Sequence, residues 1–502
     1  MQVEQFWQYW KVREDPFRAE EARHDPVLTR LLASDVTHPD FQKVYGDPTA
    51  PSAAVVFGEK GSGKTALRLL LEKRLSDHNQ KNPGNRVWVV AYDDLNPVLD
   101  RFMHTLRPAL KRDDQPLDHF RLADHQDAIL SQIVTGLIDA LIDGSPVLPK
   151  DARKSIRRMG RARRVDFGIL ASLYDQPRTG NALSRWGSIS RLLRLSWLPT
   201  LAASKWIGLL MALTAAVIAL ASWIGKGGMS GLHLAMVGLS IAASVLLLGH
   251  WAWHSLRLWS ISRRIVKELR VIDRPVPLVR TALAELSARE LSAVPLPSAN
   301  DQDTRYQLID RLLGVLQAIG FSGVIVLIDR IDEPAIVNGD ARKMKSLIWP
   351  MFNNKFLQQN RVGVKLLLPG DLRHLLWREE VDFFQRARLD KQNMIERLVW
   401  SGPTLYDVCS KRLSICREAE AESITLTDLF DTDVTRQELI DALEQMRQPR
   451  DCFKFLYQLI QEHCANVTAE QPTWKIPRIT LNHVRKLQSQ RVQDLSRGLA
   501  PA

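Results

Sequence analysis

The sequence has little cysteine. Its 502 residues include four, all in the last quarter of the chain: Cys409, Cys416, Cys452 and Cys464. They form no CxxC pair, and no histidine-rich metal spacing accompanies them. A disulfide-stapled scaffold and a zinc-binding module are therefore not indicated. We expect reduced, packed thiols, which suit a reducing cytosol.

Charge is missing from two long stretches. Residues 206–225 and 229–253 contain no Asp, Glu, Lys or Arg. About 20 apolar residues cross a bilayer as a helix, and apolar side chains lie on all sides of each stretch rather than in the stripe of a soluble amphipathic helix. Only residues 226–228 separate the two. The pattern predicts an antiparallel transmembrane hairpin with helices at about 201–225 and 229–253.

The flanks of the hairpin favour a membrane over the alternative, two buried core helices of a soluble protein. Only Lys226 marks the far side of the hairpin, whereas basic residues cluster on the near side, so both termini are expected in the cytoplasm. Tryptophans occur where an aromatic belt would fall, and the N-terminal residues have no apolar run long enough for a cleaved signal. The basic flanking residues are Arg185, Arg191, Arg194 and Lys205 before the hairpin, and Arg257, Arg263, Arg264 and Lys267 after it.

The net charge of +12 is concentrated in one region. Residues 150–274 hold 20 Lys and Arg against 5 Asp and Glu, a net of +15, so the rest of the chain carries 12 − 15 = −3. The densest part, KDARKSIRRMGRARR at residues 150–164, could bind nucleic acid or anionic lipid headgroups. Because it lies beside the hairpin, lipid headgroups are the favoured partner.

A phosphate-binding loop follows the first strand-like run. Residues 53–57, AAVVF, are typical of a short buried strand, and residues 66–75 after the loop have a helical pattern. Between them the GxxxxGK(S/T) motif is complete and in the strand–loop–helix context that it requires. It predicts that loop amides and Lys64 bind the phosphates of ATP, and that Thr65 is a ligand of Mg²⁺. The loop reads Gly58, Glu59, Lys60, Gly61, Ser62, Gly63, Lys64 and Thr65.

A second apolar run ends in an acid, as the phosphate-binding loop requires. Residues 324–328, VIVLI, predict a strand buried on both faces. Asp329 follows directly and is the expected Mg²⁺ carboxylate. Further strands are predicted at 86–92, 361–368 and 396–400, alternating with helices such as 125–142 and 305–319. From about Pro403 the chain lacks strand patterns, which predicts a helical lid over the nucleotide.

The fold class expected is α/β, a parallel-sheet P-loop NTPase domain with an inserted two-helix transmembrane hairpin and a C-terminal helical lid. Four parts are predicted along the chain. Residues 1–148 carry the phosphate-binding loop, 149–275 the basic segments and hairpin, 276–402 the strand with Asp329, and 403–502 the lid.

Membrane helices between two nucleotide motifs resemble the KAP family of P-loop NTPases, within the broader AAA+/STAND-like group that has an additional strand in its sheet. Residues 58–65, the hairpin and VIVLIDRIDE at 324–333 carry the resemblance. It implies that Arg450, in QPRD at 448–451, is a lid arginine that contacts the γ-phosphate. It also implies that Arg386 or Arg388, in FFQRARLDK at 383–391, is an arginine finger. For each arginine, an ordinary surface charge is the alternative.

The sequence departs from that family at one position. The family has a second acid after the first, in an IDDLDR-like sequence, whereas Arg330 stands here. A guanidinium cannot accept a proton. Either Asp332 or Glu333 takes the role of orienting the attacking water, or the protein hydrolyses ATP slowly and acts as an ATP-loaded switch.

Three functions are compared at this stage. The leading one is an ATPase switch on a bacterial inner membrane, acting in signalling, assembly or phage defence, as a homo-oligomer with a possible effector protein. The alternative is a nucleic-acid-handling ATPase of the initiator or loader type. A transporter is disfavoured because two helices without charged residues make a poor substrate path.

Overall fold

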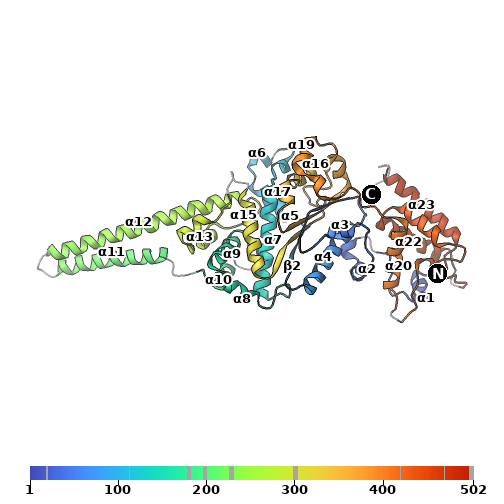
Figure 1. Cartoon of the computed structure of the whole chain (residues 1–502), viewed down its shortest axis with the longest axis horizontal. Helices are drawn as coiled ribbons and strands as arrows, with labels where there is room; N and C mark the ends of the chain where they lie inside the picture. The colour runs from blue at the N-terminus through green and yellow to red at the C-terminus, as the bar shows by residue number, and fades with distance from the viewer. Residues whose placement is uncertain are drawn as a thin grey trace. The chain divides into compact units, whose positions relative to one another are not determined.

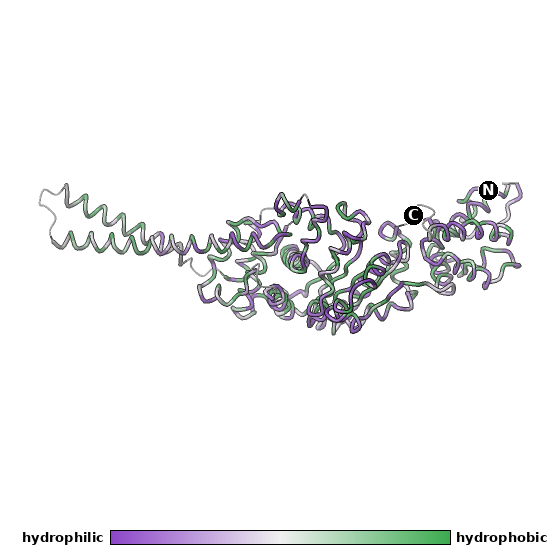
Figure 2. The backbone as a smooth tube through the Cα atoms, turned by 90° about the horizontal axis from the view of Figure 1, so that it is seen from above, coloured by the Kyte–Doolittle hydropathy of each residue, from purple (hydrophilic) through white to green (hydrophobic). Residues whose placement is uncertain are grey.

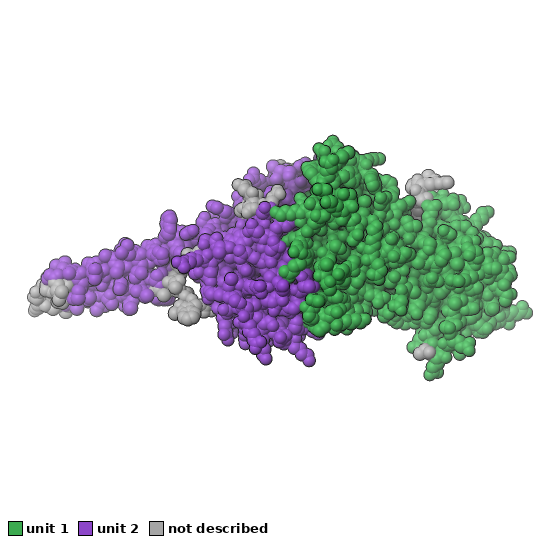
Figure 3. Space-filling model, in the orientation of Figure 1, with its two compact units in different colours: residues 1–95, 324–502 green, residues 96–323 purple. Residues whose placement is uncertain are grey.

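The computed structural model describes residues 1–18, 21–111, 113–177, 182–195, 200–224, 231–297, 303–418, 420–468 and 470–496. The chain divides into two compact units (Figure 3). Unit 1 comprises residues 1–95 and 324–502, and unit 2 comprises residues 96–323. Unit 2 is therefore inserted in the sequence between the first two strands of unit 1 and the remainder of its sheet.

Unit 1 contains a five-stranded parallel sheet in the order β2-β3-β4-β1-β5. β4 pairs in parallel with both β1 and β3, so it separates the strand before the glycine-rich loop from the strand before Asp329. Because parallel strands share one carboxyl edge, the loops after β1, β3 and β4 meet at that edge. The strands are β1 (Ala54–Gly58), β2 (Arg86–Tyr92), β3 (Phe321–Ile328), β4 (Val362–Pro369) and β5 (Asn393–Ile395).

Four of the five predicted strands are confirmed, and the fifth was misplaced. Residues 396–400 have no regular structure, and β5 ends before them at Ile395. After β5 only the Leu398 amide still bonds the β1 carbonyl of Phe57, at 2.8 Å. The chain then leaves the sheet and carries Trp400 to the glycine-rich loop, where its indole donates to the Ser62 carbonyl at 2.8 Å.

Helices of unit 1 cover the sheet and form a second core. α4 (Lys64–Lys81) packs Leu67, Leu70 and Leu71 against sheet residues. The C-terminal region is helical, as predicted, and its core includes all four cysteines. N-terminal residues Phe6 and Trp7 also belong to that core. The other helices of unit 1 include α1 (Val3–Tyr9), α2 (Pro26–Leu31), α3 (Phe41–Tyr45), α16 (Ala341–Ile348), α17 (Asn354–Leu357), α18 (Gly370–Leu376), α19 (Val381–Ala387), α20 (Gly402–Ile415), α21 (Arg436–Met446), α22 (Pro449–Ala465) and α23 (Arg478–Ser496).

Unit 2 is helical over its described residues (Figure 1). The predicted helices 125–142 and 305–319 are confirmed as α7 (Leu122–Asp143) and α15 (Asp303–Ala318). The others are α5 (Asn96–Thr105), α6 (Pro108–Lys111), α8 (Ala152–Arg158), α9 (Arg161–Tyr174), α10 (Ala182–Leu193), α11 (Thr200–Ile224), α12 (Gly231–Glu268), α13 (Val276–Ala284) and α14 (Ala288–Ala293).

α11 and α12 are long and apolar enough to cross a membrane (Figure 2). They pack closely: Ser244 donates to the Gly208 carbonyl at 2.8 Å, and a Cβ at Gly208 would come within 3.0 Å of Leu248. α12 extends to Glu268, beyond the predicted end at residue 253, because one side of residues 254–268, with Leu258, Ser262 and Ile265, is buried and the helix packs against α13. The predicted loop at Lys226 lies outside the described residues, as does Trp197, one of the tryptophans expected in the aromatic belt.

Candidate functional site

The glycine-rich loop joins the end of β1 to the start of α4. Gly61 and Gly63 have φ angles of +94° and +92°, which side chains other than glycine rarely adopt. A Cβ at Gly58 would lie 2.4 Å from the Ser62 hydroxyl, and one at Gly61 would lie 2.9 Å from Gln448. All three glycines are therefore required by the geometry. The loop ends at the N-terminus of an 18-residue helix, whose amides and dipole favour an anion.

Lys64 closes the loop by donating to the Gly58 and Glu59 carbonyls at 2.8 and 3.0 Å. Burial lowers the pKa of its ammonium, Asp329 and Asp332 oppose that change, and Arg450 adds to it. Lys64 and Arg450 are thus close enough to repel one another. Two neighbouring cations and a helix N-terminus are features that favour an anion at this position.

Thr65 and Asp329 connect the two predicted motifs. The Thr65 hydroxyl donates to Asp329 Oδ2 at 2.9 Å, across 264 residues of sequence. The Asp329 carboxylate is 1% exposed, and burial raises its pKa, while the Thr65 hydrogen bond and the charges of Arg68 and Lys64 act in the opposite direction. A hydroxyl and a buried carboxylate fit Mg²⁺, which takes oxygen ligands and binds through one or two protein groups plus substrate phosphates. Within the described residues no group of three or more His, Cys, Asp or Glu could hold a metal by itself.

The structure separates the two candidate acids after Asp329. Arg330 has a φ of +60° and forms an ion pair with Glu333, which lies in the tight turn that follows. Asp332 instead acts electrostatically on Lys64. The charge of Asp332 therefore acts on Lys64, whereas the Glu333 carboxylate is paired with Arg330.

Two further charged residues at the site escaped the sequence reasoning. Arg68, one turn along α4 from Lys64, is 4% exposed and lies 3.5 Å from Asp329 and 3.3 Å from Asp93, at the end of β2. Asp371, just after β4, also acts on Lys64. Both could have been found: Arg68 by its helical spacing from Lys64, and Asp371 because it follows a strand that reaches the same edge of the sheet.

The C-terminal helical region contacts the loop directly. Gln448 donates to Glu59 at 3.0 Å, and the Arg450 amide donates to the Gly61 carbonyl at 3.5 Å. Arg397 forms an ion pair with Glu59 at 3.0 Å, and Trp400 bonds the loop as described above. Arg450 lies in the first turn of α22, so this helix begins at the loop. The C-terminal helical region thus touches the backbone of the glycine-rich loop.

No protein-family model matches this sequence, and no curated protein matches it. The site therefore has to be interpreted from its own geometry.

Several candidate residues are not brought into this arrangement. Arg386 lies in α19, where its side chain donates to the Asp382 carbonyl of its own helix at 3.3 Å. Arg388 ends α19 with a φ of +51°. Within the described residues no interaction given for either arginine reaches the glycine-rich loop. An arginine finger acts on a neighbouring subunit's site, so its role in trans stays a prediction. Lys60 is exposed on the loop and Ser62 is buried in it.

Proposed function

We propose that this chain is a P-loop ATPase anchored to a membrane by α11 and α12, in which ATP drives a conformational change of the lid. The observation that carries the proposal is the hydrogen bond from Thr65 to Asp329, because it joins the glycine-rich loop to a buried carboxylate at the end of a separate strand. The position of β4 between β1 and β3 supports the additional-strand class that the sequence resembles.

Each residue has a definite task in this proposal. The loop amides and Lys64 bind the β- and γ-phosphates, and Arg450 reaches the γ-phosphate from the lid. Thr65 and Asp329 would hold Mg²⁺, which would neutralise the negative charge of the phosphates. Asp332 orients the attacking water, since its charge acts on Lys64, whereas Glu333 is paired with Arg330.

The lid contacts explain how nucleotide could act as a switch. In the structure Lys64 donates to two loop carbonyls, while Gln448 and Arg450 contact Glu59 and Gly61. A γ-phosphate would recruit Lys64 and Arg450 to new acceptors. The lid would then move relative to the loop, and an effector protein or a second copy of the chain could sense that movement.

Substitution of Lys64 tests the nucleotide site. We expect Lys64→Ala to bind MgATP at least about 100-fold more weakly than wild type, because a charge-assisted contact to the phosphates is lost in a site with few other cations. Isothermal titration of the full chain measures this. Lys73→Ala is the matched control, since Lys73 lies on the exposed side of the same helix and pairs with Asp77. Equal affinities of Lys64→Ala and wild type would remove the assignment.

The exposure of α11 and α12 supports the membrane anchor. Only 11% and 6% of their apolar windows are buried, whereas a core helix of a soluble protein would be mostly buried. A cysteine at Gly227 should react with an impermeant thiol reagent added outside intact cells, and one at Ser188 should not. Labelling at Ser188 alone would reverse the proposed orientation, in which both termini lie on the cytoplasmic side of a bacterial inner membrane.

The nucleic-acid alternative loses part of its support. It relies on the basic segment 150–164, but three arginines there have partners within unit 2. Arg153 donates to the Leu141 carbonyl at 2.8 Å, Arg161 pairs with Glu290 at 2.6 Å, and Arg164 donates to the Leu193 carbonyl at 3.2 Å. Salt-dependent binding of a DNA duplex by the purified chain would restore this alternative.

A further inference from the structure

α12 changes character where its apolar part ends. Beyond about residue 253 one side of the helix, with Leu258, Ser262 and Ile265, is buried within unit 2. The opposite side stays exposed. Trp253 and Leu256 are 73% and 64% exposed, and the basic residues of this side follow them along the helix. Large apolar side chains next to cations on one exposed face are typical of a membrane interface.

Tryptophans hold two cations at this level of the hairpin. Lys205, near the start of α11, lies with its ammonium 5.6 Å from the Trp206 ring centre and 5.3 Å from that of Trp251 on α12. The Arg263 guanidinium lies 5.1 Å from the Trp259 ring centre. Trp is enriched where a membrane meets water. These contacts therefore hold the Lys205 ammonium and the Arg263 guanidinium beside the tryptophans that mark the expected membrane–water boundary.

The direction of α12 aims its arginines at the boundary. Helical side chains lean toward the N-terminus of their helix, and the N-terminal part of α12 is its apolar part. Arg263 illustrates this, since its guanidinium lies over Trp259, one turn earlier. From Trp253 to Arg264 the helix rises about 16 Å, and the headgroup layer is roughly 5–8 Å thick on each side. Arg257, Arg263 and Arg264 thus reach back toward headgroup depth.

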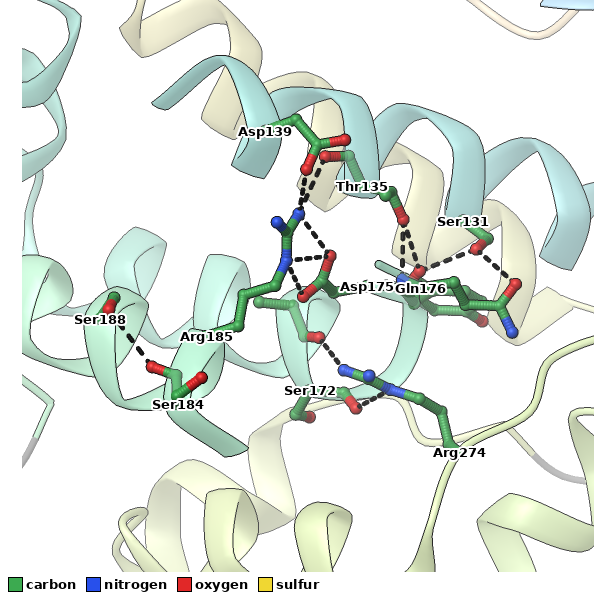
Figure 4. Close-up of polar contacts among 12 residues, drawn as sticks. Ser131, Thr135, Asp139, Ser172, Asp175, Gln176, Ser184, Arg185, Ser188 and Arg274 are labelled. Atoms are coloured by element: carbon green, nitrogen blue, oxygen red, sulfur yellow. Dashed lines mark hydrogen bonds and ion pairs between the residues drawn. The ribbon is translucent and has the colours of Figure 1, made fainter. Parts of the chain in front are cut away.

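Two arginines, one in α10 and one after α12, bind the C-terminal end of α9 and the residues that follow it (Figure 4). Arg185, before α11, pairs with Asp175 at 2.8 Å and with Asp139 at 2.5 Å. Arg274, after α12, donates to the carbonyls of Ser172 and Ala171 at 2.9 and 2.7 Å at the end of α9. The contacts of Arg185 and Arg274 therefore meet at the C-terminal end of α9. The exposed basic face beside them keeps a fixed place in unit 2.

We propose that these residues form a binding site for the headgroups of anionic phospholipids. We call the site the Trp-Arg collar, and it consists of Lys205, Trp206, Trp251, Arg257, Trp259, Arg263 and Arg264. The site rests on the proposed membrane anchor. In the segment 150–164, by contrast, Arg153, Arg161 and Arg164 contact other parts of unit 2, while Lys154, Arg157 and Arg158 are exposed and allow a direct comparison.

The test uses the full chain in nanodiscs of phosphatidylcholine, alone or mixed with phosphatidylglycerol. Lipids that remain with the protein after transfer to detergent are counted by class. We expect wild type to retain phosphatidylglycerol over phosphatidylcholine. The triple variant Arg257→Gln/Arg263→Gln/Arg264→Gln should lose about tenfold or more of that preference, because each arginine near an anionic surface strengthens association about fivefold. The matched control Lys154→Gln/Arg157→Gln/Arg158→Gln, on exposed residues of α8, removes the same charge and should keep the preference.

Three control measurements accompany the lipid-retention experiment. Thermal unfolding in phosphatidylcholine alone shows whether the triple variant is folded, and if it is not, Arg257→Gln alone is used. Inorganic phosphate should not displace the retained lipid, and displacement would mean a general anion site and overturn the proposal. Equal loss in both triple variants, or loss in the control alone, also overturns it. If wild type is extracted from membranes by alkaline carbonate, the anchor itself fails, which is a separate result from an unchanged lipid preference.

Discussion

Each unit has a buried carboxylate beside an arginine. The two carboxylates differ in how closely the arginine approaches and so in how fully it balances their negative charge. Asp329 in unit 1 receives hydrogen bonds from the Thr65 hydroxyl at 2.9 Å and from the Arg330 backbone amide, and Arg68 approaches only to 3.5 Å. Asp175 in unit 2 is gripped by Arg185, whose Nε lies 2.8 and 3.1 Å from its two oxygens and whose Nη2 lies 3.0 Å from one of them. Burial raises the pKa of both carboxyl groups.

This difference in hydrogen bonding distinguishes a carboxylate that can bind a ligand from one that only holds helices together. A carboxylate that is saturated by a bidentate arginine has no capacity left for a ligand and serves to hold elements together. A buried carboxylate whose charge is only partly balanced costs free energy when no ligand is bound. A bound cation would offset that cost. On this view Asp329 is poised for a metal, and Asp175 fastens α9 to α10.

A comparison of the two acids that follow Asp329 gives the prediction with the largest expected effect, which is on kcat. The charge of Asp332 acts on Lys64, whereas Glu333 is paired with Arg330. If Asp332 orients the water, Asp332→Asn should lower kcat by about 10²–10⁴-fold. Glu333→Gln should stay within about fivefold of wild type, since an exposed ion pair contributes about 1 kcal/mol at most. Steady-state ATP turnover measures both, with MgATP affinity as the control.

Two results would contradict this assignment. If both variants turn over like wild type, the role passes to another acid, with Asp371 the next candidate. If wild type itself shows no turnover above Lys64→Ala in its membrane, the protein is an ATP-binding switch rather than an ATPase.

The second prediction compares Asp175 and Asp329 directly. Asp175→Asn leaves Arg185 partly uncompensated in a buried site, which should cost about 3–5 kcal/mol of local stability. Asp329→Asn removes a buried charge that is poorly compensated, so the nucleotide-free protein should be as stable as wild type or more so. Hydrogen exchange of α9 and α10, and of β3 and α4, reports the two local stabilities. Equal destabilisation by both variants would erase the distinction drawn here.

The third prediction concerns a buried lysine, and it has the smallest expected effect, a change in stability. Lys365, in the middle of β4, is 1% exposed, and its ammonium has no hydrogen-bond partner among the described residues. Burial lowers its pKa to about 8 from 10.5. Such a shift corresponds to a cost on the order of 3 kcal/mol at neutral pH. Lys365→Met should recover about 2–3 kcal/mol of stability in unit 1.

The pH dependence of that gain follows from the direction of the shift. Between pH 8 and 10.5 the unfolded chain holds the proton and the folded chain does not, so raising the pH favours folding. The advantage of Lys365→Met should therefore be full below pH 8 and should shrink as the pH approaches 10.5. Denaturant midpoints at both pH values measure it, with the exposed Lys391→Met as control. A constant difference would show that Lys365 stays paired or charged in the fold.

The sequence by itself determined the parts whose structure is local. The glycine-rich loop could be predicted because its turn needs glycines at fixed positions and an adjoining strand and helix. Four strands and the two apolar helices were predictable, because unbroken apolar runs have few alternatives to burial in a sheet or a bilayer. Asp329 was found because it ends such a run.

Only the tertiary structure decided which distant residues meet. It paired Glu333 with Arg330, brought Trp400 and Gln448 to the loop, and gave Arg153, Arg161 and Arg164 partners within unit 2. Pairings of this kind depend on loop paths and on packing between elements far apart in the chain. No short pattern encodes them, because the hydrophobic effect that drives packing is not directional.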